Sequence, residues 1–259
     1  MKKDKRTLNQ HLMKKSLLLF AFALALSFGA FSQTYNYAIN SLNIPCIEQK
    51  GDLMLGLGWS RGASFRALEV QAVYSPMRHL AVMANYFGAP EKSVRKQEVY
   101  GTNFHLWEAG VGIYEKLPKG AASLFAGFGS GNLFSHYRQG RTADFNIQRW
   151  FLQPGLSYRS HHFQAGLALR LSHLSYHRAV VDYSIESPDI QFIQNIEKSA
   201  PMFLPELGIQ GGVRLKPVTI NLSISFIFPN TNEWDFIRLN SSIGVIVDIG
   251  VGRKNVGSK

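Results

Sequence analysis

Histidine and aspartate are the residues of this chain best suited to chemistry, because an Asp–His pair can activate water as a general base. The candidates that could meet in one region are His105, His136, His173, His177, Asp144, Asp182 and Asp189. Their spacing forms no recognised motif, and the G-x-S-x-G pattern of serine hydrolases does not occur. The sequence therefore predicts no catalytic residue.

Metal and cofactor signals are equally weak. His161 and His162 are adjacent but lack further ligands at zinc spacing. The stretch GFGSGN (127–132) has neither the lysine nor the following helix of a phosphate-binding loop. Cys46 is the single cysteine and cannot form an internal disulfide. We expect no metal and no cofactor, and we expect Cys46 to be a small half-buried residue.

The N-terminus has the organisation of an export signal. Two basic clusters precede the apolar run LLLFAFALAL (17–26), which is shorter than the ~20 residues of a membrane-spanning helix. Small residues then precede Gln33, which predicts cleavage after Ser32. Translation could start at Met1 or at Met13. Residues 1–32 hold six of the 28 Lys and Arg, and the others form no block typical of nucleic-acid binding.

Beyond residue 33 the dominant pattern is alternation of apolar and polar residues, which predicts β-strands. In FQAGLALRLSH (163–173), for example, every second residue is apolar and Arg170 stands on the other face. Ten segments show such alternation: 52–60, 66–75, 79–87, 105–114, 123–130, 148–158, 163–173, 203–215, 218–228 and 242–251.

A soluble sandwich and a membrane barrel both produce this pattern, and three features favour the barrel. Apart from the first, connections after odd-numbered strands are long, and those after even-numbered strands are short, as in barrels with both ends in the periplasm. Glycines crowd the polar face, as expected inside a narrow barrel. Aromatic residues cluster near both strand ends on the apolar face, which predicts an aromatic girdle of Trp59, Tyr74, Tyr86, Trp107, Trp150 and Tyr158.

The barrel interpretation places several charged residues inside the lumen, because an arginine facing lipid near the midplane costs ~2–4 kcal/mol. We expect an Arg170–Glu206 pair between neighbouring strands. The predicted charged layer across the lumen comprises Glu69, Glu108, Arg149, Arg170 and Glu206.

With this architecture the chain resembles the small outer-membrane β-barrel proteins of Gram-negative bacteria, in particular the ten-stranded type. The resemblance implies an all-β, closed, antiparallel up-and-down transmembrane barrel over residues 48–252. We expect a cleaved signal peptide (1–32), a short periplasmic segment (33–47) and a C-terminal tail (253–259). The final strand departs from the usual pattern, because GRKNVGSK follows Val251 where such barrels often end on an aromatic residue.

Two functions remain open from the sequence. The first is a non-catalytic barrel with a structural or surface-binding role or a narrow, porin-like solute passage. The alternative is an outer-membrane enzyme, an omptin-like protease or a lipid-modifying enzyme, with its site at the extracellular mouth. Expected partners are outer-membrane lipid and lipopolysaccharide, the barrel-assembly machinery and an extracellular ligand at the long loop 176–201. No nucleic acid is expected.

Overall fold

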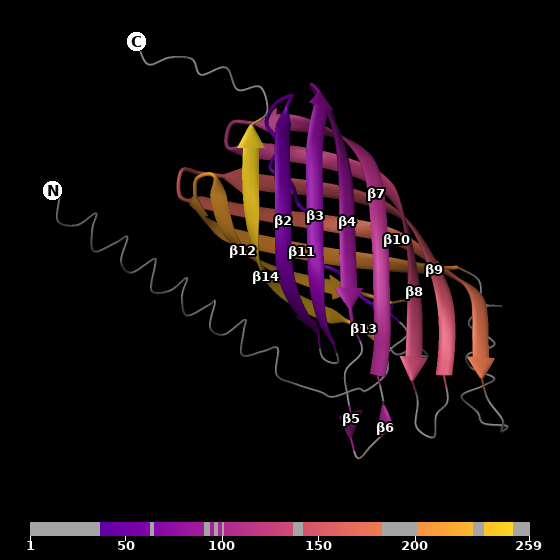
Figure 1. Ribbon diagram of the computed structural model, residues 1–259. Helices are drawn as coiled ribbons and strands as arrows, with labels where there is room; N and C mark the ends of the chain where they lie inside the picture. Colours follow the sequence, from indigo (N-terminus) through magenta and orange to yellow (C-terminus); the bar gives the residue numbers. More distant parts are fainter. Residues whose placement is uncertain are drawn as a thin grey trace, which may run out of the picture.

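Ten long strands close into one antiparallel barrel (Figure 1). The computed structural model describes residues 37–62, 65–90, 94–95, 98–99, 101–136, 142–182, 201–229 and 236–250. The barrel strands are β2 (Asp52–Gly62), β3 (Arg66–Met77), β4 (Leu80–Ala89), β7 (Gly101–Leu117), β8 (Gly120–His136), β9 (Thr142–Arg159), β10 (Phe163–Asp182), β11 (Met202–Leu215), β12 (Val218–Ile227) and β14 (Leu239–Gly250).

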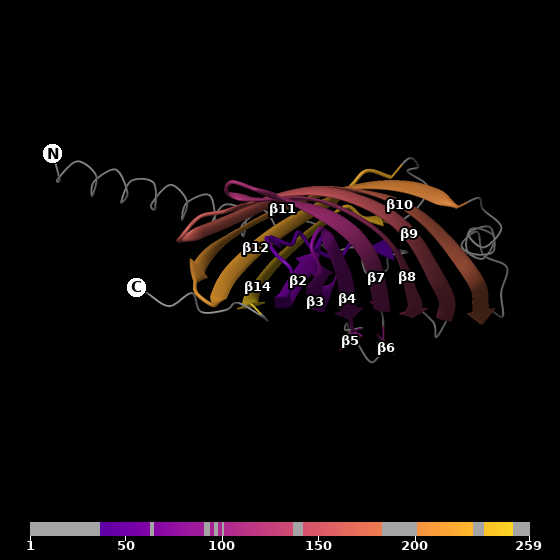
Figure 2. The ribbon, with the colours of Figure 1, turned by 90° about the horizontal axis from the view of Figure 1, so that it is seen from above.

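Each barrel strand pairs with its neighbour in the chain, and β14 closes the barrel against β2. The expected all-β, up-and-down barrel of ten strands is therefore confirmed. Figure 2 shows the strands curving around the lumen. Among the described residues, no helix is long and apolar enough to cross a membrane.

The two ends of the barrel differ. At one end, which we call the turn end, β3–β4, β7–β8, β9–β10 and β11–β12 are joined by two or three residues. Gly120 has a φ of +142° at the β7–β8 turn, and its missing Cβ would lie 1.8 Å from the Ser157 carbonyl oxygen. Only glycine satisfies both conditions. The other end, which we call the loop end, carries the remaining connections.

Strands at the loop end are longer than expected. The segments 88–104, 131–147 and 174–202 were predicted as connections, but β7 begins at Gly101, β8 and β9 leave only 137–141 between them, and β10 continues to Asp182. In Figure 1 these strands extend below β2, β3 and β4. Most of the predicted loop 176–201 lies outside the described residues, as do residues 1–32 and 253–259.

The side chains explain this extension. Outside the barrel, apolar residues up to Trp107 and Trp150 give way toward the loop end to Asn103 and Asn146. Inside, polar residues give way to buried apolar ones such as Phe145. Alternation therefore continues with its polarity inverted, so the strands persist while their exterior becomes that of a water-exposed sheet.

Three short elements accompany the barrel. β5 (Val94–Arg95) and β6 (Glu98–Val99) pair with each other at the loop end. β1 (Tyr37–Ala38) pairs in parallel with β13 (Phe236–Ile237), which lies between β12 and β14 in the chain.

Candidate functional site: a plugged lumen

Residues 37–47, here called the plug, lie inside the barrel. All eleven are buried, and each residue other than Pro45 is at most 6% exposed. Tyr37 contacts Phe236 near the loop end, whereas Ile47 packs beside Met54 and Tyr114 nearer the turn end. Residues 33–47 were expected to form a short periplasmic segment, and the described part of it, 37–47, is enclosed by the barrel strands. The plug runs along the lumen before β2 begins.

Four of the five predicted inward charged residues meet at the middle of the barrel. Arg149 of β9 contacts Glu108 of β7, and its Nη1 lies 3.1 Å from Oε1 of Glu206 on β11. Arg170 Nη1 on β10 lies 3.3 Å from Glu108 Oε1 and 3.9 Å from Glu206 Oε2. Arg170 and Glu206 are direct cross-strand partners. These four side chains, here called the charged layer, have no net charge.

Glu69 of β3 lies apart from the charged layer. Its Oε1 accepts hydrogen bonds from the Ser41 backbone N–H at 2.9 Å and from Asn240 Nδ2 at 3.2 Å. Sequence reasoning placed Glu69 inside the lumen but could not show that its partners come from the plug and β14.

The plug adds hydrogen bonds to two residues of the charged layer, Arg149 and Glu108. Arg149 donates to the Tyr37 hydroxyl and, through Nη2, to Asn40 Oδ1 at 3.0 Å. Asn40 Nδ2 in turn donates to Glu108 Oε2 at 2.9 Å. The Ser172 hydroxyl on β10 donates a hydrogen bond to Glu206 Oε1 at 2.5 Å. Buried charges are stable only when paired and hydrogen-bonded, so the plug contributes directly to the stability of this layer.

Wall side chains continue to bind the plug toward the turn end. Asn43 Nδ2 donates to Asn85 Oδ1 at 2.8 Å. The backbone carbonyl of Asn43 accepts a hydrogen bond from Gln153 Nε2 at 2.7 Å. The Cys46 side chain lies close to that of Ser157 on β9. Cys46 is fully buried rather than half-buried. Beyond β1, the plug has no strand partner among the described residues, and side chains of the surrounding strands satisfy part of its polar groups.

Two interior glycines make room for the plug. A Cβ at Gly208 would lie 2.8 Å from Cβ of Leu42, and a Cβ at Gly166 would lie 2.7 Å from Cγ2 of Ile44. Both contacts are closer than real side chains adopt, so these glycines allow the plug to approach β10 and β11. The sequence indicated a crowded interior but not what crowds it.

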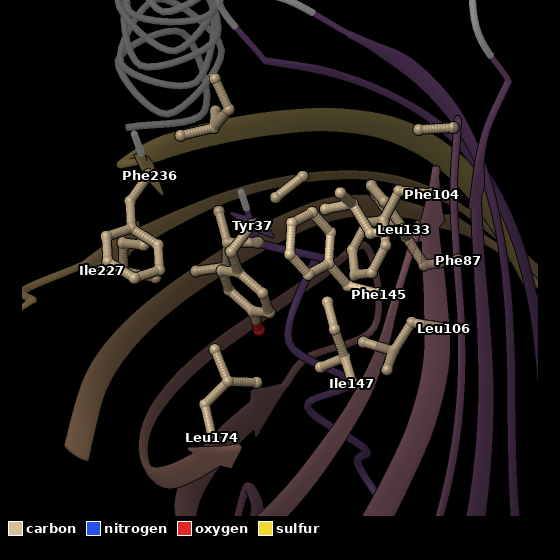
Figure 3. Packing of buried hydrophobic residues seen from close by; sticks show 14 of the residues in the cluster. Tyr37, Phe87, Phe104, Leu106, Leu133, Phe145, Ile147, Leu174, Ile227 and Phe236 are labelled. Carbon is tan, nitrogen blue, oxygen red and sulfur yellow. The ribbon is translucent and has the colours of Figure 1, made fainter. Parts of the chain in front are cut away.

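The loop-end half of the lumen is apolar. Figure 3 shows Tyr37 and Phe236 surrounded by wall residues that include Phe104, Phe145 and Leu174. The ring of Tyr37 lies 5.9 Å from that of Phe104 and 6.1 Å from that of Phe236. This cluster fills the loop-end half of the lumen like the core of a soluble protein. The polar contacts of the plug begin at the charged layer, on the turn-end side of the cluster.

The turn-end exit of the plug is held by ion pairs. Glu48 lies 3.7 Å from Lys116 and 3.8 Å from Arg159. Arg159 and Arg214 lie 3.2 Å and 3.5 Å from Asp248 on β14. These contacts link the residue that follows the plug to several strands.

The predicted girdle residues face outward. Trp59, Tyr74, Trp107, Trp150 and Tyr158 are exposed and Tyr86 is half-buried. Tyr86 and Trp107 are cross-strand partners with ring centres 4.3 Å apart, and the Trp150 ring is paired in the same way with that of Phe128 at 4.8 Å. The aromatic residues nearer the loop end therefore lie side by side around the barrel.

Three of the histidines and aspartates considered for catalysis contact other residues, while His136 of β8 and Asp182 of β10 are both register partners of Thr142 on β9. His105 Nδ1 is 2.7 Å from the Tyr86 hydroxyl, and His177 Nε2 is 3.0 Å from Ser175 Oγ. Asp144 accepts from Asn132 at 2.6 Å. Asp189 lies outside the described residues. No cluster of three potential metal ligands occurs in the part of the chain that the structure describes.

Sequence reasoning missed the plug. YAINSLNIPCI (37–47) has neither alternation nor helical periodicity, and it contains Pro45. Its mixture of asparagines with aliphatic residues next to a glycine-rich interior was the available signal. No protein-family model matches the chain, and a search of curated proteins finds no match.

Proposed function

We propose that this chain is a non-catalytic outer-membrane barrel that is closed to solutes by its own N-terminal plug and serves a structural or surface-binding role. The observation that carries the proposal is the continuous burial of residues 37–47 inside a closed barrel.

The exterior supports a membrane location. Large apolar side chains including Leu57, Val111, Leu156, Leu167 and Ile243 are 47–57% exposed on several strands. Monomeric soluble proteins rarely expose apolar surface this continuous. Aromatic residues flank the apolar band on both sides, as at the two interfaces of a bilayer. The export signal expected at residues 1–32 agrees with this location.

The interior supports closure. The apolar cluster blocks the loop-end half, and the charged layer crosses the middle with the plug bound to it. A small cavity of about 20 Å³ remains between the plug and β2, β3, β12 and β14. This volume holds about one water molecule, so the narrow solute passage is the weaker of the two non-catalytic roles.

The exterior also suggests the partners. The apolar band would contact outer-membrane lipid, and the polar outward face beyond Trp107 and Trp150 would lie at the level of the lipopolysaccharide headgroups. Folding into the membrane would require the barrel-assembly machinery. An extracellular ligand would bind at the loop end, where the strand extension raises the connections above the membrane.

Conductance of planar bilayers tests the proposal. The purified chain, shown to have inserted by co-flotation with lipid vesicles, should produce no steady current. A steady ohmic current would contradict closure and favour the solute-passage role. Failure to float with vesicles would contradict the membrane location itself.

The enzyme alternative has a separate test. The omptin-like hypothesis requires an Asp–His pair at the loop end, whereas His105, His177 and Asp144 bind Tyr86, Ser175 and Asn132. Hydrolysis of a peptide or phospholipid panel that is lost on replacing these residues would favour the enzyme over our proposal.

A further inference from the structure

Acceptor oxygens and apolar groups together line the cavity beside Glu69. Glu69, Gln71 and Asn221 border it from β3 and β12, and Ser41 borders it from the plug. Gln71 uses its amide nitrogen to donate to the Ser41 carbonyl at 3.0 Å, which leaves its Oε1 as an acceptor. Asn221 is 92% buried, and its Oδ1 has no hydrogen-bond partner.

Two glycines leave space in front of these oxygens. A Cβ at Gly56 would lie 3.8 Å from Gln71 Oε1, and a Cβ at Gly58 would lie 3.9 Å from Glu69 Oε2. Both glycines line the cavity. A Cβ would fit at ordinary contact distance at either position, so the two glycines leave room beside these oxygens.

The charge of Glu69 is not balanced by its surroundings. The two arginines and two glutamates of the charged layer neutralise one another. Among the described residues, no lysine, arginine or histidine forms an ion pair with Glu69, which is 97% buried. A buried ionised carboxylate without a counter-charge is strongly unfavourable, so Glu69 must either take up a proton or bind a cation.

We propose that the cavity between the plug and β2, β3, β12 and β14 binds one small monovalent cation, such as Na⁺, through Glu69, Gln71 and Asn221. One positive charge neutralises Glu69. A divalent ion would leave an excess positive charge, and Ca²⁺ takes six to eight oxygen ligands in a larger site. The seryl oxygens of Ser41, Ser223 and Ser242, which are linked by hydrogen bonds of 2.9 Å and 2.7 Å, complete the lining.

The site would connect the cation to the plug. Ser41 donates its backbone N–H to Glu69 and its hydroxyl to Ser242. A cation that stabilises the ionised carboxylate also strengthens these contacts, because a charged acceptor makes the stronger hydrogen bond. Binding should therefore stabilise the folded, plugged protein.

The test uses the folded, full chain in an uncharged detergent. Its thermal unfolding midpoint is followed by tryptophan fluorescence in NaCl and in N-methylglucamine chloride at equal ionic strength and pH. The midpoint should rise saturably with Na⁺, and the ²³Na NMR linewidth should broaden on protein addition. KCl giving the same rise supports the proposal, whereas a rise restricted to CaCl₂ or MgCl₂ overturns it.

Matched variants locate the effect. Glu69→Gln keeps the shape of the side chain and should abolish the dependence of the unfolding midpoint on Na⁺. Asn221→Leu should raise the half-saturating Na⁺ concentration about tenfold, which corresponds to about 1.4 kcal/mol. Thr219→Val, which removes a buried hydroxyl outside the cavity, should behave as wild type. Absence of a Na⁺ effect in the wild type, or an equal effect in Glu69→Gln, overturns the proposal. If Glu69→Gln does not fold, the half-saturating Na⁺ concentration of Asn221→Leu and the ²³Na linewidth test the proposal in its place.

Discussion

Replacing Arg149 with methionine removes the guanidinium around which the charged layer is organised. Arg149 is completely buried and bonds to Glu108, Glu206, Tyr37 and Asn40. Methionine keeps most of the apolar stem, so the change isolates the charged group. Removing one partner of a buried ion pair costs about 3–5 kcal/mol, and we expect a loss in this range.

The remaining arginine determines where the loss originates. Arg170 still lies 3.3 Å from Glu108 but 3.9 Å from Glu206, so Glu206 becomes the less well compensated carboxylate. A second change, Glu206→Gln, should therefore recover part of the loss. Coupled neighbours typically show interaction energies of about 0.5–3 kcal/mol.

Urea unfolding in lipid vesicles, followed by tryptophan fluorescence, measures the free energy of unfolding for the single and double variants. Arg66→Met, at an exposed position near the loop end, is the matched control and should change stability little. A single variant as stable as wild type would refute the reasoning. A double variant less stable than Arg149→Met would refute the assignment of the unpaired charge to Glu206.

Three further substitutions test the exterior, the plug contact and the loop-end cluster. Leu167→Arg should cost about 2–4 kcal/mol in vesicles, because Leu167 faces outward at mid-barrel, whereas Asn103→Arg beyond the aromatic residues should cost little; equal costs would argue against the membrane boundary. Gly208→Val places atoms against Leu42 and should make the plug sensitive to added protease, unlike wild type; continued resistance would contradict the packing. Phe104→Ala should cost about 3–5 kcal/mol in urea unfolding, and unchanged stability would show that the cluster is not packed.

The exterior of the barrel was predictable from the sequence because every strand has one face in a uniform environment. Leu167 and Leu169 alternate with Ala168 and Arg170, and such alternation needs no knowledge of neighbouring strands. The inward direction of Arg170 follows from the same argument. The strand extension was not predicted, because Phe145 and Asn146 invert the polarity that identified the preceding segment.

The interior was less predictable because its contacts join residues far apart in the chain. The partners of Asn40 are Glu108 and Arg149, and nothing local to residue 40 indicates them. The plug is extended without alternation because it is buried on all sides. Its environment depends on strands whose order must be known first.

Disulfide formation in Ser157→Cys tests the position of the plug most directly. The Cys46 side chain lies close to that of Ser157, so the introduced cysteine would lie beside the native thiol. The plugged barrel predicts that mild oxidation of the folded protein joins Cys46 to the introduced cysteine in a disulfide, seen as loss of both free thiols and reversed by reductant. Ser175→Cys, on a residue that faces outward on β10, should keep its thiols free under the same conditions. Two free, reactive thiols in oxidised Ser157→Cys would contradict the presence of residues 37–47 in the lumen.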